Sequence, residues 1–124
     1  MKNITILIID DESVARNTLK HQLEPAGYKV VVANNGNEGI QFCQKIPIDI
    51  VITDIIMPEK DGIETIDEIS RNHPNIKIIA ISAGGSSDTS NYLAAAKLIG
   101  AAHVFKKPIV KADLLASIEG LISK

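Results

Sequence analysis

The chain has 124 residues and a formal net charge of −2. Hydrophobic residues make up 45% and charged residues 23%, a balance typical of a globular protein and not of a disordered one. The length predicts one domain, residues 1–124. The small negative charge disfavours direct binding to nucleic acid, and no cationic amphipathic stretch indicates binding to a membrane surface.

Two features of the chain bear on its location. The only cysteine, Cys43, cannot form an internal disulfide, which is typical of a reducing compartment. The apolar run near the start, Ile4–Ile9, is too short for a signal peptide or a membrane span. We therefore expect a cytoplasmic protein.

Short apolar runs alternate with stretches of helical periodicity along the whole chain. The runs predict strands at Ile4–Ile9, Tyr28–Val32, Ile48–Thr53, Ile76–Ile81 and His103–Lys106. The periodic stretches predict helices at Ser13–Leu23, Glu38–Lys45, Gly62–Asn72, Tyr92–Ile99 and Val110–Ser123. Loops are predicted at Asn34–Gly36 and Gly84–Asn91, and Gly100 is expected to end a helix. The alternation predicts an α/β fold, with a mostly parallel sheet covered by helices on both faces.

Polar residues fall at the carboxyl ends of four predicted strands. Asp10 and Asp11 follow the first strand, and Asp54 follows the third. Ser82 and Lys107 follow the fourth and the fifth. In a parallel sheet these ends meet at one edge, where open α/β sheets bind ligands. We therefore expect these five residues to converge.

The chemistry of the five side chains is that of phosphoryl transfer. Three neighbouring carboxylates repel one another, and a hard cation such as Mg²⁺, which prefers oxygen ligands, relieves the repulsion. Lys107 supplies a positive charge for a phosphoryl oxygen, and Ser82 supplies a hydroxyl donor. A carboxylate is also a competent nucleophile toward phosphorus. Positioning and charge neutralisation supply most of the catalysis in such sites.

Four motifs carry a resemblance to a known family: Ile8–Glu12, Asp54–Gly62, Ile81–Ala83 and Lys107–Pro108. With these motifs in this order, the chain resembles the response regulator receiver family over essentially its whole length. The resemblance implies a three-layer (βα)5 flavodoxin-like fold, doubly wound, with strand order 2-1-3-4-5. It also implies a phosphoacceptor switch of a two-component phosphorelay, which catalyses its own phosphorylation and dephosphorylation but is not a turnover enzyme.

The resemblance assigns a role to each site residue. Asp54 would accept the phosphoryl group. Mg²⁺ would be bound by carboxylates and one backbone carbonyl, supplied by Asp10, Asp11, Asp54 and Ile56. The phosphoryl oxygens would contact Ser82, Lys107 and the backbone N–H of Ala83, and the Lys107–Pro108 bond is expected to be cis. The implied partners are a sensor histidine kinase or a histidine phosphotransfer protein as donor, and an unknown downstream protein.

Three positions depart from the usual family pattern. Many receivers carry an aromatic residue three positions before the lysine, where this chain has Val104, and the adjacent Phe105 should face the other way. The side chains at Ile56 and Gly84 cannot orient a hydrolytic water, which predicts slow autodephosphorylation. Because Val104 replaces the usual aromatic residue, we expect signalling to rely on the Gly84–Asn91 loop and the predicted helix Tyr92–Ile99 instead.

Several simpler interpretations compete with the switch. Asp10 and Asp11 would also suit the start of a helix, and Lys106 is a second basic residue beside Lys107. The histidines lack the spacing of metal ligands, and Cys43 suits a core position. A Mg²⁺-dependent phosphohydrolase, a receiver-like binding module without phosphorylation and a fragment of a larger regulator remain alternatives.

Overall fold

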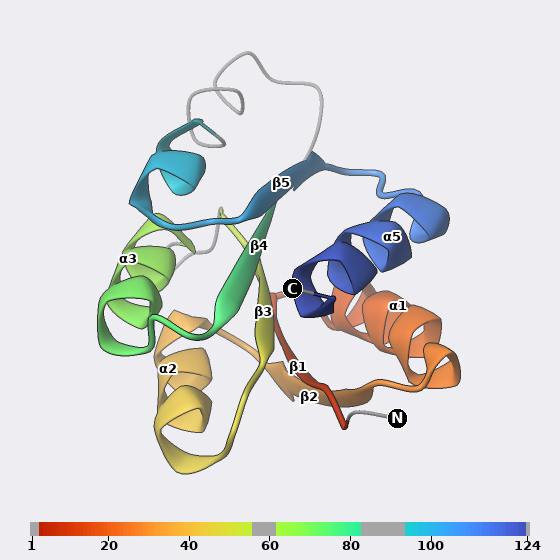
Figure 1. The fold of residues 1–124 in the computed structure, drawn as a ribbon, viewed down its shortest axis with the longest axis horizontal. Helices are drawn as coiled ribbons and strands as arrows, with labels where there is room; N and C mark the ends of the chain where they lie inside the picture. The colour runs from red at the N-terminus through yellow and green to blue at the C-terminus, as the bar shows by residue number, and fades with distance from the viewer. Residues whose placement is uncertain (1–2, 56–61, 83–93, 124) are drawn as a thin grey trace.

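A computed structural model describes residues 3–55, 62–82 and 94–123. Its centre is a five-stranded parallel sheet in the order β2-β1-β3-β4-β5 (Figure 1). The strands are β1 (Thr5–Ile9), β2 (Lys29–Ala33), β3 (Ile50–Asp54), β4 (Lys77–Ser82) and β5 (His103–Lys106). The predicted fold class and strand order, 2-1-3-4-5, are therefore confirmed.

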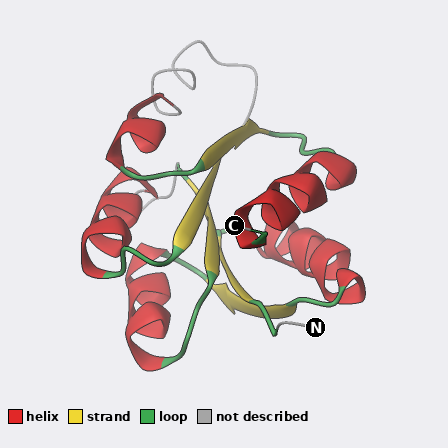
Figure 2. Ribbon diagram, viewed as in Figure 1, coloured by secondary structure: helices red, strands yellow, loops and turns green. Residues whose placement is uncertain are grey.

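Helices cover both faces of this sheet, as Figures 1 and 2 show. One layer holds α1 (Ser13–Leu23) and α5 (Lys111–Ile122), and the other holds α2 (Gly36–Lys45) and α3 (Gly62–Asn72). Residues 94–99 are also helical, and a 3-10 turn, η1 (Glu24–Ala26), follows α1. In the described ranges, no helix has the length and apolar character needed to cross a membrane.

Aliphatic side chains fill the space between the sheet and each helical layer. Leu7, Val51 and Ile66 belong to the cluster that includes α2 and α3, and Ile8, Ile52 and Leu114 belong to the cluster beneath α1 and α5. Every residue of the central strand β3 is buried, which agrees with the apolar run Ile50–Ile52 at its start. Each fully buried Ile or Leu contributes roughly 1.5–3 kcal/mol relative to an exposed one. The tightly packed core therefore holds the carboxyl ends of the strands in place.

Several predicted boundaries differ from the observed ones by one or two residues, and the start of α2 has a clear physical reason. Gly36 was expected in a loop, but it is the first residue of α2. Asn35 caps this helix, since its side chain accepts a hydrogen bond from the backbone N–H of Glu38 at 2.9 Å. Glu38 in turn accepts a hydrogen bond from the N–H of Asn34 at 2.8 Å. This reciprocal cap stabilises an earlier helix start than periodicity alone indicates.

Candidate functional site

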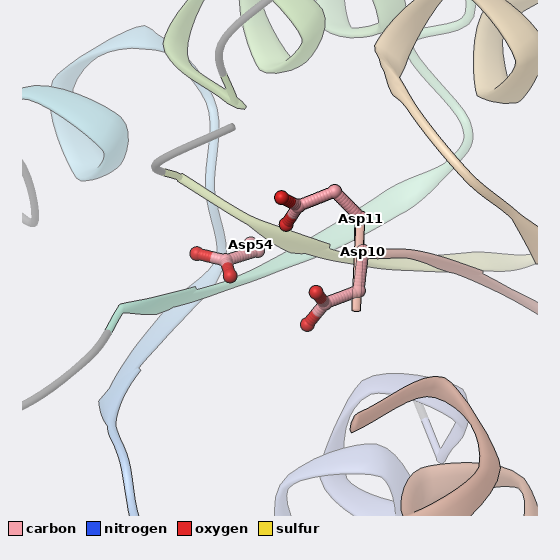
Figure 3. A group of neighbouring side chains, drawn as sticks. All are labelled: Asp10, Asp11 and Asp54. Atoms are coloured by element: carbon pink, nitrogen blue, oxygen red, sulfur yellow. The ribbon is translucent and has the colours of Figure 1, made fainter. Parts of the chain in front are cut away.

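Three aspartates converge at the carboxyl edge of the sheet (Figure 3). Carboxylate oxygens of Asp10, Asp11 and Asp54 lie within 4.8 Å of one another. Asp10 is 3% exposed and Asp54 is 7% exposed, whereas Asp11 is exposed to solvent. Figure 3 shows Asp10 and Asp11 leaving adjacent points of the chain, with their carboxylates directed toward the side where Asp54 lies. Among the acids, histidines and cysteines of the described residues, these three aspartates lie close enough together to bind one metal ion.

The end of β1 positions Asp10. Its N–H donates to the carbonyl of Ala33 at 3.2 Å, which continues the pairing of β1 with β2 for one residue. Its carboxylate Oδ1 accepts a hydrogen bond from the N–H of Glu12 at 2.9 Å, just before α1 begins. The carboxylate is therefore held beside a helix amino terminus, whose partial positive charge favours it.

Close packing beneath α3 positions Asp54. The N–H of Ile55 donates to the carbonyl of Ile81 at 2.9 Å, and the N–H of Gly62 donates to the carbonyl of Ile55 at 2.6 Å. A Cβ atom at position 62 would collide with the Asp54 carbonyl oxygen and with the Ile55 backbone. Because backbone atoms cannot rotate away, only glycine fits there without displacing Asp54.

Lys107 supplies the cation of the site. Its Nζ lies 3.4 Å from Asp10 Oδ2 and 3.3 Å from Asp54 Oδ2. Its backbone N–H donates to the carbonyl of Ser82 at 2.7 Å, and the bond to Pro108 is cis, as expected. Burial lowers the pKa of the Lys107 ammonium. The charges of Asp54 and Asp10, and the hydrogen bonds to them, raise this pKa by more than burial lowers it. The net pKa is above its ordinary value.

Ser82 ends β4, the strand next to β3, which carries Asp54 at its own end. The Ser82 side chain is fully buried, and its Oγ has no hydrogen-bond partner in the part of the chain that the structure describes. A buried hydroxyl without a partner costs roughly 1–3 kcal/mol. The sheet register places Asp54 opposite Ile81, so Ser82 lies one residue beyond the level of Asp54. A hydroxyl in this state is suited to donate to an incoming oxygen.

The remaining sequence expectations have mixed outcomes. Ile56 and Ala83, which were expected to contribute backbone groups, lie outside the described residues, as does Gly84, so slow dephosphorylation stays a prediction. Val104 packs with the cluster that includes α2 and α3, whereas Phe105 packs on the opposite face with α1 and α5. The expected opposite orientation of these two residues is therefore confirmed.

Two other residues complete this comparison with the sequence. Cys43 is a buried core residue, and burial raises the pKa of its thiol to about 11. Arg16, to which the sequence assigned no role, donates from Nη1 to the backbone carbonyl of Asp10 at 2.8 Å. Its position within a helix gave no indication of this contact, because the contact depends on how the preceding turn folds back.

Comparison with known proteins agrees with the site and the fold. A sequence profile described as "Response regulator receiver domain" matches residues 6–119. The chemotaxis protein CheY of Thermotoga maritima is 44% identical over 81 residues, which cover 64% of this chain and 68% of that protein. Response regulator RR06 of Streptococcus pneumoniae is 33% identical over 121 residues, which cover 98% of this chain and 54% of that protein.

A solved structure gives the same result. The receiver domain protein of Clostridium thermocellum superposes with a TM-score of 0.87 at 34% identity, covering 97% of this chain and 94% of that one. The fold and the acidic strand ends define a receiver-type signalling domain. The chain belongs to the response regulator receiver domain family, the receiving part of two-component systems. It spans about half the length of RR06.

Proposed function

We propose that this protein is a phosphoacceptor switch in which Asp54 receives a phosphoryl group from a phosphohistidine. The observation that carries the proposal is the pairing of a buried acceptor with compensating groups. The Asp54 carboxylate is 7% exposed, lies near two other carboxylates and is 3.3 Å from the Lys107 ammonium. A buried carboxylate at a strand end needs such partners, and the same partners suit a phosphoryl group.

The acidic cluster also fits Mg²⁺. Among the described residues, three carboxylates gather at this edge, and the Lys107 ammonium contacts those of Asp10 and Asp54. Such a group of oxygen ligands suits a hard cation. Asp10, Asp11 and Asp54 would hold the ion, together with the backbone carbonyl of Ile56. Bound there, Mg²⁺ would neutralise charge on the carboxylates and on the phosphoryl oxygens.

The protein's own residues perform the transfer. An oxygen of Asp54 attacks phosphorus as the phosphorus–nitrogen bond of the donor breaks. The donor imidazole, which carries a proton on its other ring nitrogen, leaves in neutral form. Lys107 then pairs with a phosphoryl oxygen, and Ser82 and the N–H of Ala83 donate hydrogen bonds to the others. The product is an aspartyl phosphate.

The switch then acts on other proteins. The donor would be a sensor histidine kinase or a histidine phosphotransfer protein, and phosphorylation would change the conformation to control an unidentified downstream protein. We expect these interactions to take place in the cytoplasm. Support comes from the family membership and from the buried Asp54 carboxylate, which lies beside the Lys107 ammonium.

Intact-mass measurement with acetyl phosphate tests this function. We expect a gain of one phosphoryl mass that requires Mg²⁺ and is abolished in Asp54→Asn. Asp49→Asn is the matched control, because Asp49 directly precedes β3, at the end opposite Asp54, and is exposed. A gain in mass that persists in Asp54→Asn would refute the assignment of the acceptor. Absence of any gain, with acetyl phosphate and with a phosphorylated histidine kinase, would refute the switch.

A further inference from the structure

The side chain of Arg16 holds the peptide unit that joins two of the acids. Its Nη1 donates to the carbonyl oxygen of Asp10 at 2.8 Å in a partly buried position. This carbonyl belongs to the planar peptide between Asp10 and Asp11. We propose that Arg16 is a positioning residue, which fixes this peptide and thereby the directions in which both carboxylates leave the chain. The proposal rests on the Mg²⁺-dependent function proposed above.

Arg16 lies where it can link the start of α1 to the end of β1. It is the fourth residue of α1, and its backbone N–H donates to the carbonyl of Glu12 at 3.1 Å. One residue therefore connects the first turn of the helix to the end of the strand. The regular pairing of β1 stops at Ile9, so the chain beyond it is held by individual hydrogen bonds. A flat guanidinium that meets a carbonyl loses little freedom in forming such a bond.

The affinity of a protein for Mg²⁺ depends on how precisely the ligating carboxylates are oriented. The ion demands near-ideal octahedral geometry, so small shifts of a ligating carboxylate weaken its binding. Residues that orient metal ligands without touching the metal typically contribute 10–100-fold to affinity. Arg16 is placed to do so for Asp10 and Asp11 together.

The sign of the effect separates positioning from simple charge. The guanidinium is always protonated, so as a charge it repels a nearby divalent cation. If Arg16 acted by charge alone, its removal would strengthen Mg²⁺ binding. If Arg16 positions the peptide, its removal weakens Mg²⁺ binding. The two mechanisms therefore predict opposite changes.

The experiment measures the Mg²⁺ dissociation constant of the whole chain by calorimetry, with urea unfolding in parallel. Arg16→Met keeps an apolar stem but loses the donor and the charge, and we expect the dissociation constant to rise about 10-fold. Arg16→Lys keeps the charge and one donor group, and we expect partial rescue. Arg71→Met is the matched control, because Arg71 is 73% exposed and pairs with Asp67 on α3, and we expect no change.

A second readout needs no metal. The N–H of Glu12 donates to the Asp10 carboxylate, so its hydrogen exchange should become faster in Arg16→Met than in the wild type or Arg71→Met. Unchanged or tighter Mg²⁺ binding in Arg16→Met, or unchanged exchange at Glu12, would overturn the positioning role. If the wild type itself bound no Mg²⁺, the proposed function would fail first, and the calorimetry distinguishes that result. Should Arg16→Met fail to fold, Arg16→Lys alone decides, with a weakened affinity expected.

Discussion

The two ends of the parallel sheet carry the same kinds of charged residue in opposite circumstances. At the amino end, Asp49 and Lys77 are exposed, and the Asp49 carboxylate accepts one hydrogen bond, from the N–H of Thr5 at 2.9 Å. At the carboxyl end, Asp54 is buried, and Lys107 contacts it at 3.3 Å. Water compensates charge at the first end, whereas the protein must supply the compensation at the second.

This difference explains where the molecule can do chemistry. An exposed aspartate keeps its hydration shell and acts as a local cap. A buried aspartate is cut off from water, so a cation or polar group that arrives beside it is stabilising. Substitutions that alter packing or charge at the carboxyl end should therefore have large effects, and matched substitutions elsewhere should have small ones.

The largest effect is expected for Gly62→Ala. The new Cβ would collide with the backbone of Asp54 and Ile55, which cannot move aside cheaply, so we expect a loss of about 3 kcal/mol in unfolding free energy. Gly120→Ala is the control, since a Cβ there meets nothing within 4 Å. In the helix α5 it should stabilise by roughly 0.5–1 kcal/mol. Urea unfolding measures both, and equal changes in the two variants would contradict the close approach at Gly62.

An intermediate effect is expected for Lys107→Met in the absence of Mg²⁺. The substitution leaves Asp10 and Asp54 buried without their cation, and because Lys107 is 28% exposed we expect a loss of about 2 kcal/mol, below the value for a fully buried pair. Lys77→Met, at the amino end of β4, should stay within about 0.5 kcal/mol of the wild type. Comparable losses in both variants would show that the ion pairs at the carboxyl end contribute nothing specific.

The difference in unfolding free energy between the wild type and Lys107→Met should depend on pH. The pKa of Lys107 is raised in the folded state, despite the opposing effect of burial, by the charges of Asp54 and Asp10. Its contribution to stability is therefore complete below the unfolded pKa, roughly 10.4, and is lost as pH rises through the higher folded pKa. The stability difference between the wild type and Lys107→Met should be level up to about pH 10 and shrink above it. A difference that grows in that range would reverse the sign of the linkage.

Much of the fold could be predicted because the apolar patterns are strong. The strands and most helices follow the periodicity, and the placement of Asp54 and Lys107 follows from parallel strand ends meeting at one edge. The contacts of Arg16 and Gly62 could not be predicted. The first depends on how the turn before α1 folds back, and the second on how closely the start of α3 approaches the end of β3. Residue type alone specifies neither approach. Gly36 was misplaced for a related reason, since a side-chain cap decides where its helix begins.

The smallest expected effect isolates the metal from the fold. Asp11 is exposed, so Asp11→Asn should change stability without Mg²⁺ by no more than about 0.5 kcal/mol. At a Mg²⁺ concentration ten times the dissociation constant, the wild type should gain about 1.4 kcal/mol, because the ion binds the folded state alone. Asp49→Asn should keep this gain, and Asp11→Asn should lose most of it at the same concentration. The measurement is urea unfolding with and without Mg²⁺. Equal gains in the two variants would mean that the ion stabilises the protein from somewhere other than the carboxyl edge, and the contrast between the two ends of the sheet would then have no bearing on metal binding.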